Sequence, residues 1–170
     1  MKTFYIVIAF FVTGLFYGQT VLDPFENHDD VTAIVVNKKM FDLIGKVESN
    51  SKDTQDFLAL AKKLDLLKVF MTSNNSKATD LKKAAEKLSK ASNLVQMMRM
   101  NDQVGEVQVS VKTDASNSNI KELLMFVDGS ANQQSILMYL KGDFSLDEIS
   151  ILTHKLKLPG GDILKRASKK

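Results

Sequence analysis

The chain has two histidines, the side chains best suited to acid–base chemistry near neutral pH, and they lie far apart, at His28 and His154. His28 stands beside three carboxylates that could bind a hard cation, namely Glu26, Asp29 and Asp30. The segment lacks the glycine and the closing glutamate of an EF-hand loop, and neither histidine belongs to an H-E-x-x-H motif. We therefore expect His28 in a solvated arm, His154 in a structural role, and no metal site.

Three methionines stand close together at Met97, Met98 and Met100. Thioether clusters of this kind select Cu(I) in oxidising compartments. On a strand, however, Met98 and Met100 share a face while Met97 points away, which argues against a copper site. Filling of the core by a flexible apolar side chain explains them better, and an adaptable apolar binding surface is the other alternative.

No side chain has the surroundings of an activated nucleophile. The chain has no cysteine and no G-x-S-x-G motif, and Gly160-Gly161 lacks the frame of a phosphate-binding loop. We therefore predict no catalytic residue, no cofactor-binding residue and no cofactor, and a protein that is not an enzyme. The alternative is a hydrolase or another enzyme with an unrecognised site, in which one of the histidines would meet a carboxylate and a hydroxyl.

The first eighteen residues have the pattern of a secretory signal peptide. Lys2 precedes an uncharged apolar run at 4–16, and Gly18 offers a small residue just before Gln19. The run of about 13 residues is shorter than the ~20 that span a bilayer, and a signal-anchor is the alternative. We expect export to the periplasm or the outside, cleavage, and a soluble product without disulfides.

The net charge of +3 is unevenly distributed. Residues 155–170 hold six basic side chains and one acid, a balance of +5, so 19–154 carry −3 once Lys2 is removed with the signal. An acidic body and an export signal argue against nucleic acid as a partner. The basic tail could make weak contact with an anionic surface.

Apolar periodicity predicts about six strands and four helices. The strands are expected at 31–36, 66–72, 94–100, 107–111, 120–127 and 135–140, and Lys141-Gly142-Asp143 ends the last one. The helices are expected at 40–47, 53–64 and 79–91, with a fourth that starts at a capping box of Ser145 and Glu148. Four consecutive strands favour an antiparallel meander. The predicted fold is α+β: a mixed, largely antiparallel sheet with helices packed mainly on one face.

The predicted organisation has four parts. A signal peptide at 1–18 precedes a polar arm at 19–30, a single domain at 31–158 and a basic tail at 159–170. Within the domain, three valines alternate strictly with polar residues, which places the valines toward the core and the polar residues toward solvent. The valines are Val107, Val109 and Val111, and the polar residues are Glu106, Gln108 and Ser110.

Two of the predicted strands, at 123–127 and 136–140, are apolar on both faces. A sheet covered by helices on one side needs only one apolar face, so another segment covers the second face or that face is a contact patch. We expect a contact surface that includes Leu124, Phe126, Leu137 and Tyr139. Its partner would be an unknown protein or an apolar ligand in the cell envelope.

Three stretches resemble the domain of unknown function 4252 family, which is found in exported proteins of Bacteroidota. They are VTAIVVNKKMFDLI at 31–44, IKELLMFVDG at 120–129 and ILMYLKGDFSLDEISIL at 136–152. The resemblance implies a bacterial envelope protein and supplies no catalytic residue, cofactor or ligand. Together with the residues above, it favours an exported, non-catalytic binding or interaction module.

Overall fold

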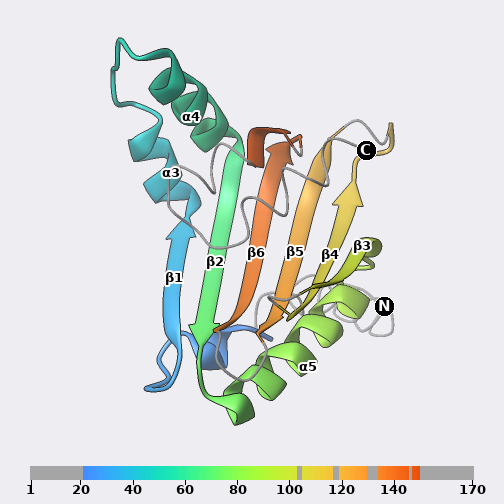
Figure 1. The fold of residues 1–170 in the computed structure, drawn as a ribbon. Coiled ribbons are helices and arrows are strands. Elements are labelled where there is room, and N and C mark those ends of the chain that lie inside the picture. The colour runs from blue at the N-terminus through green and yellow to red at the C-terminus, as the bar shows by residue number, and fades with distance from the viewer. Residues whose placement is uncertain (1–20, 103–104, 117–118, 130–133, 146, 150–170) are drawn as a thin grey trace, which may run out of the picture.

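The computed structural model describes residues 21–102, 105–116, 119–129, 134–145 and 147–149. They form one six-stranded sheet of order β1-β2-β6-β5-β4-β3 (Figure 1). The strands are β1 (Thr32–Asn37), β2 (Leu64–Thr72), β3 (Val95–Asp102), β4 (Gly105–Thr113), β5 (Ile120–Gly129) and β6 (Ser135–Phe144). The helices are η1 (Asp23–Phe25), α3 (Lys38–Ile44), α4 (Lys52–Lys63) and α5 (Asn75–Ala91). The predicted α+β class and the sheet of about six strands are confirmed.

The last four strands form the expected meander, and β6 then pairs with β2, so that β1 and β3 are the two edges (Figure 1). All five neighbouring pairs are antiparallel, and none is the parallel pair of a mixed sheet. Strand β6 does not end at Lys141-Gly142-Asp143 but continues to the fully buried Phe144, which pairs with Ile120. A Cβ at Gly142 would lie 2.5 Å from the carbonyl oxygen of Lys63, so glycine lets the end of α4 approach the strand.

Side-chain caps set where the helices begin. The Asn37 side chain accepts a hydrogen bond from the Met40 amide and starts α3 directly after β1. Asn74 accepts from the amides of Ser76 and Lys77, so α5 starts at Asn75 rather than at Thr79. The predicted capping box also forms: Ser145 Oγ accepts from the Glu148 amide, and a Glu148 carboxylate oxygen accepts from the Ser145 amide. Most of the helix predicted to follow lies outside the described residues.

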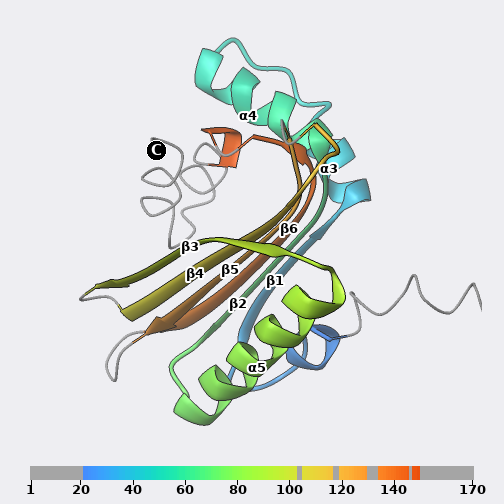
Figure 2. The same cartoon turned by 90° about the vertical axis from the view of Figure 1, so that its right-hand side faces the viewer.

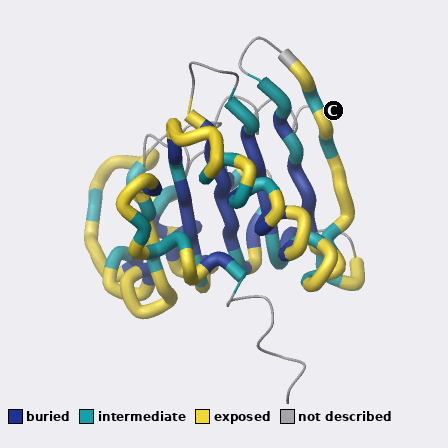
Figure 3. Tube along the Cα trace, turned by 90° about the horizontal axis from the view of Figure 1, so that it is seen from below, coloured by how far each residue is buried: buried dark blue, intermediate teal, exposed yellow. Residues whose placement is uncertain are grey.

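Helices cover both faces of the sheet, whereas the sequence suggested mainly one. On one side α3 and α4 pack against β1, β2 and β6, and on the other α5 packs across β2, β6 and β5 (Figure 2). We call these sides the α4 face and the α5 face. Each face has its own hydrophobic core, and successive residues of the central strands point alternately into one core and the other. Val69 and Met138 belong to the core of the α4 face, and Phe70 and Leu137 to the core of the α5 face. Figure 3 shows buried residues along the central strands and exposed ones on the outer sides of the helices.

The expected contact residues share one face, as predicted, but they are covered there. Leu124, Phe126, Leu137 and Tyr139 are only 3%, 3%, 0% and 1% exposed, in a cluster with the buried side of α5. They are core residues of the α5 face, and the expectation that they form an open contact surface is wrong. The reason is that α5 covers this second face of the sheet, which the sequence analysis did not assign to any helix.

The three valines of β4 point into the core, as the alternation predicts. Val107, Val109 and Val111 are at most 3% exposed and lie on the α4 face. The polar residues between them point to the α5 face, where Gln108 is half-buried and Ser110 is buried. They therefore do not face open solvent, because α5 lies beside them.

Val109→Asp should destabilise the fold by more than about 3 kcal/mol or prevent folding, since it buries an unpaired carboxylate. Val95→Asp is the matched control, because Val95 lies on edge strand β3 and is 64% exposed. Urea denaturation monitored by circular dichroism compares the two variants. Equal midpoints would show that the register of β4 is wrong.

The N-terminal segment 21–30 packs against the sheet, although the sequence assigned it to a polar arm outside the domain. Leu22 is 1% exposed, and the Phe25 ring meets the Phe70 ring edge-on with centroids 6.1 Å apart. The ammonium group of Lys68 on β2, itself only 7% exposed as a side chain, lies 2.7 Å from an Asp23 oxygen and 2.5 Å from a Glu26 oxygen. These two ion pairs tie η1 to the sheet.

Two opposing effects set the protonation of Lys68. Burial by itself lowers the pKa of Lys68, but the hydrogen bonds and ion pairs with Asp23 and Glu26 outweigh it and raise the pKa above 10.5. A raised lysine pKa means that the stabilisation is complete below pH 10.5 and is lost as the pH rises through the raised value.

Removing the two acids should cost more stability than removing the lysine. Asp23→Asn with Glu26→Gln leaves a buried ammonium without counter-charge, a loss of about 3–5 kcal/mol. Lys68→Met leaves carboxylates whose side chains are 51% and 30% exposed and which water can solvate. Urea denaturation at pH 7 compares the two, and above pH 10.5 only the wild type should lose this contribution. A larger loss for Lys68→Met would contradict the account.

Candidate functional site

An open groove of about 200 Å³ lies on the α5 face, between α5 and the β3–β4 side of the sheet. Its floor is apolar and is formed by residues of β5, α5 and the turn before β3. Leu124 and Phe126 form the floor, Ala85 of α5 adjoins them, and Leu94 closes the floor at the start of β3. Two of the residues predicted for a contact surface thus line a groove, beside polar side chains of the neighbouring strand.

A row of uncharged polar side chains borders the floor. In the register of β4 and β5, Gln108 pairs with Phe126 and Ser110 pairs with Leu124, so each apolar floor residue has a polar neighbour. On β3, Gln96 pairs with Ser110 and extends the row to the edge of the sheet. The groove therefore offers amide and hydroxyl groups beside an apolar base.

Helix α5 forms the opposite wall. Lys82, Glu86, Ser89 and Lys90 line the groove at helical spacing, one side of α5 facing the strands. Towards the core, Leu81, Ala84, Ala85 and Leu88 are buried and fix the helix on the sheet. The wall is thus positioned by the amphipathic pattern of α5.

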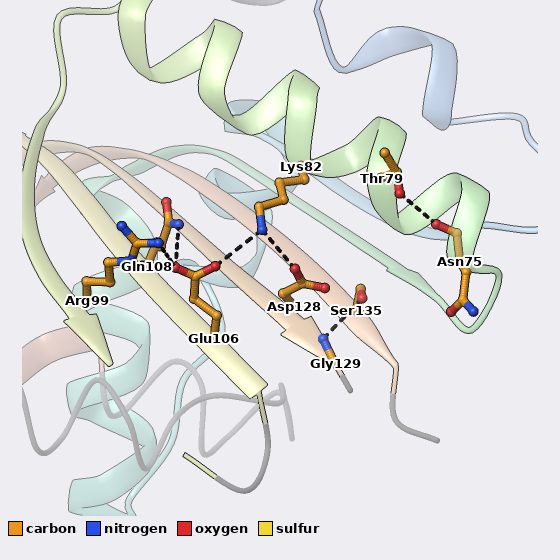
Figure 4. Close-up of polar contacts among 9 residues, drawn as sticks. All are labelled: Asn75, Thr79, Lys82, Arg99, Glu106, Gln108, Asp128, Gly129 and Ser135. Atoms are coloured by element: carbon orange, nitrogen blue, oxygen red, sulfur yellow. Dashed lines mark hydrogen bonds and ion pairs between the residues drawn. The ribbon is translucent and has the colours of Figure 1, made fainter. Parts of the chain in front are cut away.

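An ion cluster stands where Lys82 reaches the sheet (Figure 4). Lys82 Nζ lies 2.9 Å from Asp128 Oδ2 on β5 and 3.2 Å from Glu106 Oε2 on β4. Arg99 of β3 pairs with the second oxygen of Glu106, and Gln108 Nε2 donates to that oxygen at 3.1 Å. The cluster links α5 to three strands and holds the Gln108 amide at the groove.

These contacts shift both central pKa values. The hydrogen bond to Asp128, followed by the contacts with Glu106, raises the pKa of Lys82 against the effect of burial. Hydrogen bonds from Gln108 and then from Lys82 lower the pKa of Glu106 below 4.5. Both groups are therefore charged at neutral pH, and the acid contributes stability above pH 4.5 that is lost as the pH falls through its lowered pKa.

Tyr139 lies deeper under α5 and has a separate polar partner. Its hydroxyl donates to a Glu122 oxygen, and Glu122 also lies 3.8 Å from both Lys112 and Lys141. Burial, and then the contact with Glu122, raises the pKa of Tyr139 far above 10.0. The phenol is therefore a protonated donor that belongs to the core.

The residues first considered for chemistry lie away from the groove. His28 is half-buried in the N-terminal segment, where its Nδ1 accepts a hydrogen bond from the Asp30 amide at 3.3 Å. Among the described residues, no group of three His, Asp or Glu side chains could hold a metal ion. Met98 packs against the α4-face core while Met97 is 62% exposed, so they point apart as predicted. His154 lies outside the described residues.

The fold and the groove define an α+β domain with a two-sided core and an open polar-rimmed groove. The chain belongs to the family described as domain of unknown function DUF4252, whose model matches residues 25–152. The predicted family is thereby confirmed, and the match spans every strand and the helix that walls the groove. No curated protein and no solved structure matches the chain. Across the described ranges, no helix combines the length and apolarity needed to cross a bilayer.

Sequence reasoning missed the polar half of the groove. Gln108 and Ser110 were visible as the polar positions of an alternating strand, but alternation alone assigns such positions to solvent. Lys82 was visible in the lysine-rich side of its helix. Only the pairing of β4 with β5 and the position of α5 show that these side chains surround one space.

Lys82→Met should raise the pKa of Glu106 toward its ordinary value, because a hydrogen-bond donor and a positive charge are lost. Lys83→Met is the matched control, since Lys83 is the next residue and is exposed. Carboxyl-carbon NMR across an acid titration measures the pKa of Glu106 in each of the two variants. The same Glu106 pKa in both variants would mean that the Lys82 ion pair does not form in solution.

Proposed function

We propose that the chain is an exported, non-catalytic binding module of the cell envelope that holds an extended segment of a partner protein in the groove beside α5. The observation that carries this proposal is the row of Gln96, Gln108 and Ser110 next to the apolar floor of Leu124 and Phe126. Amide and hydroxyl groups match the donors and acceptors of a peptide backbone. The floor suits one apolar side chain of the same segment.

The size of the groove favours a segment of a protein over an enclosed small molecule. Small-molecule sites usually measure about 300–1,000 Å³ and bury most of the ligand, whereas this groove measures about 200 Å³ and is open. An extended peptide places successive side chains on opposite sides, so one can enter the groove while the next points to solvent.

The chemistry of the lining supports binding rather than catalysis. The charged groups at the rim are lysines and Glu86, and Lys82 is occupied by Glu106 and Asp128. His28, the described histidine, lies in the N-terminal segment and does not line the groove. Export is supported by the charged start, the apolar run at 4–16 and the small residue Gly18.

Site-specific photo-crosslinking tests the proposal in the native envelope. A photoreactive amino acid at Gln96, on the exposed rim, should form a defined crosslink to one protein. The matched control is the same amino acid at Lys87, which is exposed on α5 but does not line the groove. It should form no crosslink to that protein.

A groove-filling variant separates groove binding from nearby contact. Ser89→Trp should abolish the crosslink formed from Gln96, because the indole would occupy the space beside Leu124. Lys87→Trp should leave it intact, and thermal melts should show both variants folded. A crosslink that is equally strong from Lys87, or that survives Ser89→Trp, would contradict binding in the groove.

A further inference from the structure

Edge strand β1 lacks the features that normally protect the edge of a sheet. Natural edges are guarded by charges, prolines or bulges that prevent pairing with another chain. Opposite edge β3 follows this rule, with Arg99 in the strand and a register shift between Gln96 and Met98. Strand β1 has the sequence TAIVVN, pairs with β2 without a register shift and contains neither charge nor proline. Among the described strands it pairs with β2 alone.

The exposed apolar side chains of β1 lie on both faces of the sheet. Ile34 is 37% exposed and pairs with Val69 on the α4 face, whereas Val35 is 44% exposed and pairs with Lys68 on the α5 face. A strand added at this edge would cover part of each residue and would also satisfy the outward backbone groups of β1.

Opposite charges flank the strand. Asp29 and Asp30 precede it, Lys38 and Lys39 follow it, and all four residues are exposed. In an antiparallel pair of two identical strands, the acidic end of each copy lies beside the basic end of the other. The edge is therefore complementary in charge to a second copy of itself.

We infer that β1 pairs antiparallel with β1 of a second copy about a two-fold axis at Ile34, which joins the two sheets into one. Directly opposed residues of an antiparallel pair lie on the same face of the sheet, so their positions differ by an even number. With Ile34 at the axis, Thr32 meets Val36 of the second copy, and the acidic turn at 29–30 comes beside the first turn of α3, where Lys38 and Lys39 lie. With Val35 at the axis, the acidic turn would be shifted by two residues along the second copy, away from these lysines, so the charges favour the first register.

The partners already present leave this arrangement possible. Lys38 Nζ lies 3.3 Å from Asp42 and 3.6 Å from Asp65 and also donates to the Lys62 carbonyl. Asp30 accepts from Asn74, so the attraction between the copies depends mainly on Asp29 and Lys39. Lys39 makes no ion pair with the part of the chain that the structure describes. A strand of six residues is a small interface compared with the ~1,200–2,000 Å² of stable complexes, so the dimer should dissociate on dilution.

Single cysteines test the axis directly, because the chain has no cysteine of its own. Ile34→Cys should form an intermolecular disulfide under mild oxidation, since opposed Cα atoms lie about 4.5–5.5 Å apart, within the range of a disulfide. Val35→Cys should react at least tenfold more slowly, because its two copies are offset by two residues, roughly 7 Å along the strands. Met97→Cys on β3, where Met97 is 62% exposed against 37% for Ile34, is the second control. Reaction of Ile34→Cys no faster than both controls would overturn the inference.

Charge reversal tests the orientation independently. Asp29→Lys and Lys39→Asp should each weaken dimerisation by roughly tenfold, because each brings like charges close together twice in the dimer. The double variant should restore it. Sedimentation velocity across a concentration series measures the association, and Ser89→Trp at the groove should behave as the wild type. Additive loss in the double variant, or a monomer at all concentrations for the wild type, would contradict the pairing.

Discussion

The whole architecture depends on one constraint: the central strands are apolar on both faces. Strands β2, β5 and β6 place large side chains alternately on the α4 face and the α5 face, and both sets are buried. A sheet of this kind has to be covered on both sides, because either face left open would expose a large apolar patch. Helices α3 and α4 provide one cover, and α5 provides the other with the N-terminal segment (Figure 2).

The groove lies beside β4, a strand that is not apolar on both faces. Strand β4 is apolar only toward the α4 face, and its other side carries Glu106, Gln108 and Ser110. Helix α5 packs on β2, β6 and β5. The polar side of β4 therefore stays partly uncovered, next to the apolar groove floor on β5. At the other end of the same face, Lys68 is buried within the apolar cover and holds η1 through two carboxylates. The α5 face thus has a closed half at β2 and an open half at β4.

The strength of the sequence patterns decided which features could be predicted. Strict alternation predicted the orientation of the β4 valines, and the capping box at Ser145 predicted a helix start. The sequence could not predict that α5 lies on the second face. The amphipathic pattern of a helix shows which of its sides is buried, but not which surface of the sheet it covers. The sequence therefore predicts an open surface at Leu124 and Tyr139, although both are buried. The Lys68 ion pairs were equally hidden, since they join residues more than forty positions apart.

The most direct test of the groove as a binding site is an amide NMR spectrum of the isotope-labelled protein, recorded before and after addition of the partner captured at Gln96. The side-chain amide signals of Gln96 and Gln108 should shift, because both groups border the groove. The signal of Gln55 should stay in place, because Gln55 lies on α4, where its Nε2 donates to the Ser49 carbonyl at 2.9 Å. Unchanged signals from Gln96 and Gln108 together with a shifted Gln55 would place the partner elsewhere and contradict the account.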